Sequence, residues 1–152
     1  MPAETEAVLN AILTTATDAL QEVLGTMFFS DAAPVACEHH LAGEWSAARV
    51  TFTGVPAGEL RLMLSPGLAL IFAASFLGID EQEVTPETAD QVNCELANMI
   101  CGAILSRLHP DSLVALSAPE LTPVDFEHPG SIHQCFAIPE GTLAISLSSD
   151  AW

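Results

Sequence analysis

The 152-residue sequence contains no lysine and only three basic residues, Arg49, Arg61 and Arg107. Against them stand 20 acidic residues, which give a formal net charge of −17 at pH 7. Proteins that bind nucleic acid or anionic membrane surfaces need clustered Lys and Arg, so this balance argues against both kinds of partner. The charge balance also argues against a site that binds phosphate with this chain's residues only, because the positive charge would have to come from another molecule.

Charged residues make up only 15% of the chain, while 50% of it is hydrophobic. A chain of this length can bury one proper core, and we expect a single domain over residues 1–152. With so few charges, much of the surface has to be neutral or covered by a partner.

The sequence lacks a recognisable secretory leader, because the N-terminus MPAETEAVLNAIL is acidic where such a leader is basic. We therefore expect a cytoplasmic protein with reduced cysteines. They are Cys37, Cys94, Cys101 and Cys135. The run from Leu62 to Ile79 has no charged residue and is long enough for a membrane span. Ser65-Pro66-Gly67 interrupts it, which favours a soluble strand followed by a helix.

Apolar residues at helical spacing predict a first helix over about residues 4–28. Ser65-Pro66 and Thr85-Pro86 each place a capping residue before a proline at the first helical position. We expect the two helices that start there to end at Gly78 and at about Leu108, where His109-Pro110 follows.

The remaining apolar runs predict strands. They are APVACEHHLAG, SAARVTFTG and GELRLMLS before the second helix, and SLVALSAPEL, SIHQCFAIP and TLAISLSS after the third. The first three are expected to be adjacent antiparallel strands. We find no internal repeat. This order of elements predicts an α+β fold in which a mostly antiparallel β-sheet is covered by long helices.

The helix expected over residues 86–108 is apolar around most of its circumference, which is typical of a helix buried by its neighbours. One narrow strip lacks large apolar groups and forms a polar stripe: Gln91, Glu95, Asn98, Gly102 and Ser106. Such a stripe faces either water or a docking partner. Gly102 and Asn98 favour a partner, because glycine costs about 1 kcal/mol in a helix interior and asparagine prefers caps and turns.

The segment ELANMICGAILSRL resembles the signature helix of the CheC/CheX/FliY family of chemotaxis phosphatases. That signature is Ser or Asp, then Glu four residues on, Asn three further and a small residue four further. The matching positions here are Gln91, Glu95, Asn98 and Gly102, so Gln91 departs from the pattern. EVLGTMFF in the first helix and LSAPEL after the third resemble the CheX branch of the family.

The resemblance implies a CheC/CheX-like fold and hydrolysis of the aspartyl phosphate of a CheY-type response regulator. Asn98 would position the attacking water, and Glu95 would pair with the regulator's active-site lysine. Gln91, Gly102 and Ser106 would complete the partner-binding stripe. The resemblance implies no cofactor of this chain's own, since Mg²⁺ would be supplied by the receiver domain, and it implies a homodimer.

Three alternatives remain open at this point. The stripe can be the solvated face of a core helix, and the chain can be a non-catalytic binding or assembly module with the same fold. The pairs Cys37/His39 and His133/Cys135 would each point to one face of a strand, so adjacent strands could bring them together as a zinc site. No Ser-His-Asp nucleophile motif, phosphate-binding loop or Rossmann glycine pattern is apparent.

Overall fold

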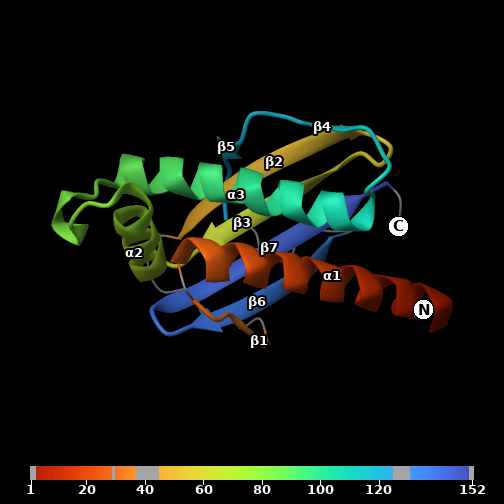
Figure 1. Ribbon diagram of the computed structural model, residues 1–152, viewed down its shortest axis with the longest axis horizontal. Coiled ribbons are helices and arrows are strands. Elements are labelled where there is room, and N and C mark those ends of the chain that lie inside the picture. Colours follow the sequence, from red (N-terminus) through yellow and green to blue (C-terminus); the bar gives the residue numbers. More distant parts are fainter. Residues whose placement is uncertain (1–2, 29, 37–44, 125–130, 151–152) are drawn as a thin grey trace.

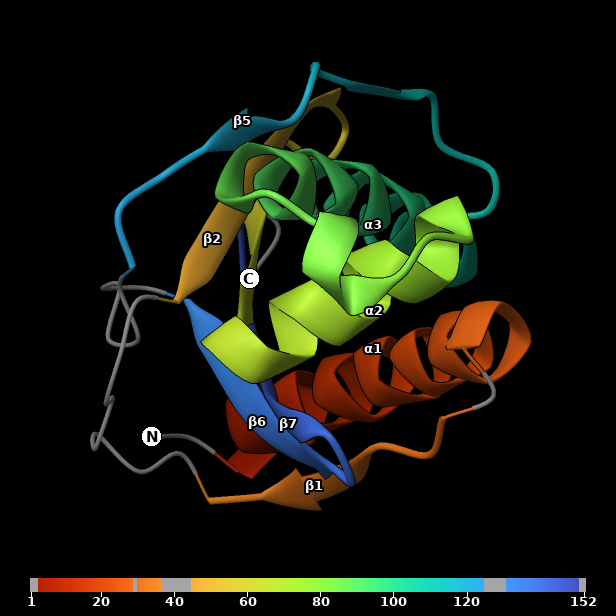
Figure 2. The same ribbon diagram turned by 90° about the vertical axis from the view of Figure 1, so that its left-hand side faces the viewer.

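Three helices lie on one face of a seven-stranded sheet whose neighbouring strands are all antiparallel (Figures 1 and 2). The computed structural model describes residues 3–28, 30–36, 45–124 and 131–150. Its arrangement of helices and strands confirms the predicted α+β fold. The elements are α1 (Ala3–Phe28), β1 (Ala33–Val35), β2 (Ser46–Gly54), β3 (Gly58–Leu64), α2 (Pro66–Leu77), the 3-10 helix η1 (Glu81–Glu83), α3 (Pro86–Leu108), β4 (Val114–Leu116), β5 (Glu120–Leu121), β6 (Ile132–Ile138) and β7 (Gly141–Ser149).

The predicted helix boundaries are confirmed, although one cap differs from the expectation. At the start of α3, the Thr85 hydroxyl accepts a hydrogen bond from the Thr88 backbone N–H at 3.1 Å. The Ser65 hydroxyl does not cap α2 and instead accepts from the Thr142 N–H of β7 at 3.1 Å. α2 ends at Gly78, whose φ of 66° is a left-handed conformation that glycine adopts without strain.

The uncharged run from Leu62 to Ile79 is divided between β3 and α2, as the Ser65-Pro66-Gly67 interruption predicts. In the described part of the chain, no helix is both long enough and apolar enough to cross a bilayer.

The strand order is β1-β6-β7-β3-β2-β4, and β5 also pairs with β2. β2 and β3 are neighbours, as expected, but the prediction that β1 lies beside them is wrong. β1 pairs with β6 at the other edge of the sheet, where Val35 lies opposite Cys135. The outer edge of β2 is occupied instead by β4 and β5, and β1 lies below β6 at the opposite edge (Figure 1).

The topology repeats internally, although the sequence shows no repeat. A helix and its following strands occur twice, first as α1, β1, β2 and β3 and then as α3, β4 with β5, β6 and β7. Exchanging the two sets leaves the strand order unchanged, because β3 and β7 form the central antiparallel pair. α1 and α3 are therefore equivalent elements, and they pack against each other on the same face of the sheet (Figure 2).

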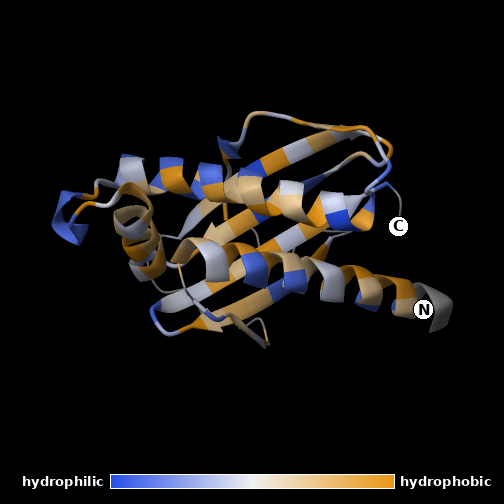
Figure 3. Cartoon of the chain, in the orientation of Figure 1, coloured by the Kyte–Doolittle hydropathy of each residue, from blue (hydrophilic) through white to orange (hydrophobic). Residues whose placement is uncertain are grey.

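Successive side chains of a strand point to opposite faces of the sheet. In Figure 3, hydrophobic residues along the strands are accordingly interrupted by more polar ones. In β3, Leu60, Leu62 and Leu64 belong to the main core under the helices. Met63 points to the opposite face, where it packs in a second, small cluster. That face also carries the ion pair between Arg49 and Glu120.

The cysteines differ from the expectation of reduced thiols. Cys94 and Cys101 are free, and burial raises the pKa of the Cys101 thiol to about 12. Cys135, however, is disulfide-bonded, so the expectation is wrong for this residue. Cys37 and His39 of the zinc alternative lie outside the described residues. A sulfur in a disulfide offers no thiolate to a metal, so Cys135 cannot serve as the zinc ligand of that alternative in this state.

Asn93 is a polar residue on the buried face of α3. Its side-chain amide donates to the Ser46 hydroxyl at 2.9 Å and to the Leu62 carbonyl oxygen at 3.4 Å. The Ser46 hydroxyl in turn donates to a carboxylate oxygen of Asp90, one turn earlier on α3, at 2.7 Å. This network joins α3 to β2 and β3 and fixes which side of the helix faces the sheet.

We predict that Asn93→Ala lowers the free energy of unfolding by about 2–3 kcal/mol, because it leaves a cavity and removes a buried hydrogen-bond partner. Denaturation by urea would measure the change. The matched control is Asn98→Ala on the same helix, where the side chain is only half-buried. We expect it to change stability by less than about 0.5 kcal/mol. Equal losses in the two variants would contradict the anchoring role of Asn93.

Candidate functional site

The polar stripe of α3 faces away from the sheet. Its residues are either exposed, as are Gln91, Glu95 and Ser106, or half-buried, as are Asn98 and Gly102. The residues between them on the helix are mostly buried in the core: Val92, Asn93, Leu96, Ala97, Ile100, Cys101, Ile104 and Leu105. The structure therefore places all five predicted stripe residues on the accessible side of a helix that is otherwise packed.

Glu95 and Asn98 are neighbours on this surface. Three residues of helix correspond to a rise of about 4.5 Å and a rotation of about 300°, which places the two side chains on one face. Among the described residues, neither side chain makes a hydrogen bond or an ion pair. Their carboxylate and carboxamide groups are therefore available to a molecule that approaches the stripe.

A pocket with a volume of about 520 Å³ adjoins the N-terminal half of the stripe. Thr88, Gln91 and Glu95 contribute its polar side. Apolar walls come from Phe76 and Leu77 at the end of α2 and from Pro119 between β4 and β5. Residues of α2, α3 and the segment between β4 and β5 thus line one pocket together with Glu95.

A second pocket, of about 240 Å³, lies at the C-terminal half of the stripe, where Gly102 and Ser106 face Leu116 of β4. A Cβ atom added at Gly102 would find the Leu116 Cδ1 as its nearest neighbour, at 3.9 Å. Packing inside this chain therefore does not require glycine at position 102. Asn98 lines neither pocket and lies on the helix between them.

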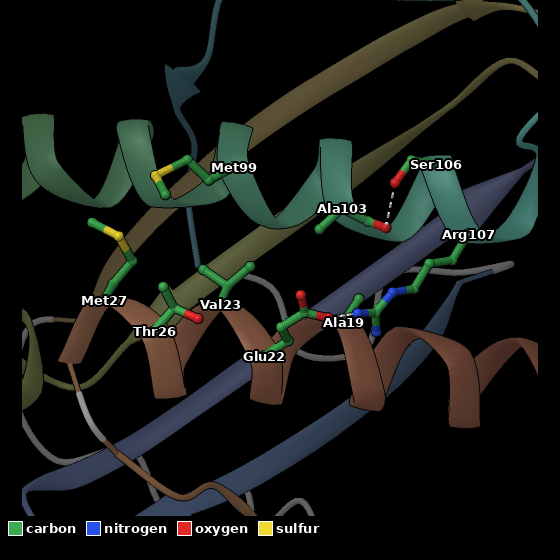
Figure 4. Close-up of a pocket in the computed structure, with 9 residues that line it drawn as sticks. All are labelled: Ala19, Glu22, Val23, Thr26, Met27, Met99, Ala103, Ser106 and Arg107. Atoms are coloured by element: carbon green, nitrogen blue, oxygen red, sulfur yellow. Dashed lines mark hydrogen bonds and ion pairs between the residues drawn. The ribbon is translucent and has the colours of Figure 1, made fainter.

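On its other side, the stripe borders a groove between α3 and α1 with a volume of about 320 Å³ (Figure 4). Met99, next to Asn98 in the sequence, faces Met27 of α1 across this groove. At the opposite end, the Arg107 guanidinium forms an ion pair with the Glu22 carboxylate. The stripe is thus flanked by apolar surface on both sides, and the nearby Arg107 is already paired.

Cys94 lines the pocket at Glu95 but is poorly suited to act as a nucleophile. Burial raises the pKa of its thiol, and the carboxylates of Asp90 and Glu95 raise it further. Since the thiolate is the reactive form, Cys94 is protonated at neutral pH. Among the described residues, no group of three or more His, Cys, Asp or Glu side chains is placed to hold a metal ion.

Sequence reasoning missed several residues that shape the site. Asn93 lies at a position that the helical wheel assigns to the core, and its polar side chain among apolar neighbours was the available signal. Phe76 and Leu77 carry no such signal, because only the packing of α2 against α3 brings them to Glu95. Pro119 lies within the LSAPEL segment, but its separation from Glu95 in the sequence does not predict that the two residues line the same pocket.

A family model described as chemotaxis phosphatase CheX matches residues 46–133, which include α3 and all five stripe residues. Among curated proteins, no sequence match is found.

Several solved structures share the fold. CheX from Vibrio vulnificus superposes with a TM-score of 0.75 at 18% identity, covering 91% of this chain and 96% of that one. A CheC-like superfamily protein from Shewanella sp. PV-4 gives a TM-score of 0.73 at 21% identity, covering 91% and 97%. The CheX–CheY–BeF3–Mg complex from Borrelia burgdorferi gives 0.69 at 16% identity, covering 90% and 96%.

These structural likenesses are at low identity and show the fold, while the family model covers more than half of the chain. The antiparallel sheet, the helices on one of its faces and the outward stripe of α3 agree with that match. The chain belongs to the CheX family of chemotaxis phosphatases.

Proposed function

We propose that this protein is a phosphatase that hydrolyses the aspartyl phosphate of a CheY-type receiver domain. The observation that carries the proposal is the pair formed by Glu95 and Asn98, which are adjacent, outward-facing and without partners among the described residues. Family membership supports the reaction class. The related complex from Borrelia burgdorferi, which contains CheX and CheY, supports a receiver domain as the partner.

Hydrolysis of an aspartyl phosphate needs few catalytic groups from the phosphatase. An aspartyl phosphate already carries a good leaving group, since a carboxylic acid of the Asp type has a pKa of about 3.9. Water attacks phosphorus, the bond between phosphorus and the Asp carboxylate oxygen breaks, and the water's proton leaves with phosphate or solvent. The Asn98 carboxamide can accept a hydrogen bond from the attacking water and donate one to a phosphoryl oxygen, so it acts by orientation.

Glu95 would dock the complex by pairing with the receiver's lysine, which fixes the receiver's phosphoryl group over Asn98. Mg²⁺ and the positive charge around the phosphoryl group would come from the receiver. This division of roles fits a chain with three arginines and no lysine. Gln91, Gly102 and Ser106 would form the remaining contact surface of the stripe.

The alternative is a non-catalytic module that binds a receiver domain or another chemotaxis component. Gln91, at the position where the family signature has Ser or Asp, is the observation that favours it. Both functions would use Glu95 for docking, and only hydrolysis needs the carboxamide of Asn98. A homodimer and a cytoplasmic location are part of the proposal, and the low charge of the chain favours a covered subunit surface.

Asn98→Ala is expected to lower the rate of phosphate loss from a phosphorylated receiver by about 10²-fold, because the attacking water loses its orientation. Release of radiolabelled phosphate, with Mg²⁺ present, would measure it. Asn10→Ala on the exposed face of α1 is the matched control and should behave as wild type. If wild type and Asn98→Ala bind the receiver and neither exceeds its spontaneous hydrolysis, the phosphatase proposal is wrong and the binding module stands.

Glu95→Gln is expected to weaken receiver binding about tenfold, since it removes one charge pair at the interface. Binding of a receiver loaded with beryllofluoride and Mg²⁺ can be measured at low and high salt. Wild-type affinity should fall as salt rises, and the fall should be smaller for Glu95→Gln. Glu6→Gln, which makes the same charge change on α1, should leave affinity nearly unchanged. Similar effects of both substitutions would indicate general charge steering rather than docking at Glu95.

Gly102→Ala is expected to stabilise the fold by about 1 kcal/mol, because alanine is the better helix former and its Cβ meets no close neighbour. The same methyl group would obstruct a receiver that approaches the helix backbone, so kcat/KM should fall. Thermal unfolding and phosphate release measure the two effects.

Gly25→Ala in α1 is the control for Gly102→Ala, because its Cβ would have no atom within 4 Å. It should give a similar gain in stability with unchanged hydrolysis. A stabilised and fully active Gly102→Ala would show that the receiver does not use the space above Gly102.

A further inference from the structure

The pocket beside Glu95 combines a carboxylate with apolar side chains from α2 and the β4–β5 segment, and Thr88 and Gln91 add neutral polar groups. Its volume is about 520 Å³, and Glu95 is the one charged side chain among the described residues that line it. Leu77, at the last position of α2, is 45% exposed and does not belong to the main core. Core packing therefore does not account for a large apolar side chain at this position.

Local structure holds Leu77 there. The backbone N–H of Gly78 bonds to the Ala74 carbonyl oxygen and, with its left-handed φ, ends α2 directly after Leu77. Phe76 beside it packs against the core. The apolar wall is therefore attached to a fixed helix end and faces α3 across the pocket. Pro119 lines another side of the pocket. It lies between β4 and β5, and both of these strands pair with β2.

A carboxylate with apolar side chains on part of its pocket matches one kind of side chain in particular. Lysine carries an ammonium group on a flexible four-carbon stem, and the stem packs on apolar surface while the charge reaches a partner. An exposed ion pair contributes little, because water screens it. The same pair is strengthened when neighbouring apolar groups exclude water from it. The overall charge of −17 further favours a basic group as the occupant.

We propose that Leu77 is a specificity-determining residue of this protein, and that it packs on the stem of the receiver's lysine and excludes water from its pair with Glu95. The inference rests on the proposed docking of a receiver domain at Glu95. It adds that α2, and not only the stripe of α3, selects the receiver. A receiver with apolar surface next to its lysine fits this pocket, and one with acidic or strongly polar groups there does not.

The test uses the full chain with Leu77→Ser, Leu77→Met and, as control, Val55→Ser. Val55 is 80% exposed in the turn between β2 and β3, far in sequence from the pocket. Affinity is measured for a receiver loaded with beryllofluoride and Mg²⁺, and kcat and KM for phosphate release. Leu77→Ser should raise Kd and KM about tenfold and leave kcat within about twofold. Leu77→Met should restore wild-type values, and Val55→Ser should match wild type.

A double-mutant cycle shows whether Leu77 acts through Glu95. If it protects that ion pair from water, Leu77→Ser should raise Kd by much less in a Glu95→Gln background than in wild type. Equal effects in the two backgrounds would overturn the inference. So would an unchanged Kd for Leu77→Ser, or a change in oligomeric state by light scattering that accounts for the loss, which would assign Leu77 to contact with a second copy.

The two proposals fail in different ways. Receiver binding that depends on Leu77, with no hydrolysis above the spontaneous rate, would overturn the phosphatase function and support the role of Leu77. Hydrolysis that depends on Asn98, with Kd and KM indifferent to Leu77→Ser, would overturn the role of Leu77 alone. A wild-type protein that binds none of the receivers of its genome would overturn both.

Discussion

The rotation of α3 about its own axis decides which side chains this protein offers to a partner, and Asn93 constrains that rotation. Nine residues, or about two and a half helical turns, separate Asn93 from Gly102, so the two lie on opposite sides of α3. The hydrogen bonds from Asn93 to Ser46 and Leu62 hold one side against the sheet. The Asn93 Oδ1 is buried and has no hydrogen-bond partner within the described part of the chain, so the network carries a cost in stability. Its contribution is to specify one orientation, in which Glu95 and Asn98 face outward.

Much of this arrangement could be predicted from the sequence, because it depends on local periodicity. The cap and proline at Thr85-Pro86 fix where α3 starts, and the wheel then separates the stripe from the core. The Glu95–Asn98 spacing and the resemblance gave the candidate site before any geometry was known. The buried and the accessible residues of α3 lie on the sides of the helix where the helical wheel predicts them. The exception is Asn93, for which periodicity predicts a buried position but says nothing of the hydrogen bonds that make an amide acceptable there.

The features that the sequence could not predict depend on long-range packing. The sequence order predicts β1 as a neighbour of β2, yet β1 pairs with β6, about 100 residues later in the chain, and the outer edge of β2 is taken by β4 and β5. The walls around Glu95 have the same origin, because Leu77 and Pro119 approach α3 only when α2 and the β4–β5 segment are in place. Their apolar character is visible in the sequence, but their shared pocket is a property of the fold.

The internal symmetry of the topology allows the proposed site on α3 to be compared with the equivalent positions on α1. α1 and α3 occupy matching positions beside the central β3–β7 pair. On α3, Glu95 is free among the described residues and Asn98 follows three residues later. On α1, Glu22 is paired with Arg107, and Gly25 stands three residues after it. Gly25 has no carboxamide to orient water. A lysine approaching Glu22 would also compete with a guanidinium already held by the neighbouring helix. Under the proposed function, α3 would therefore be the docking helix among the described elements, and α1 would support it.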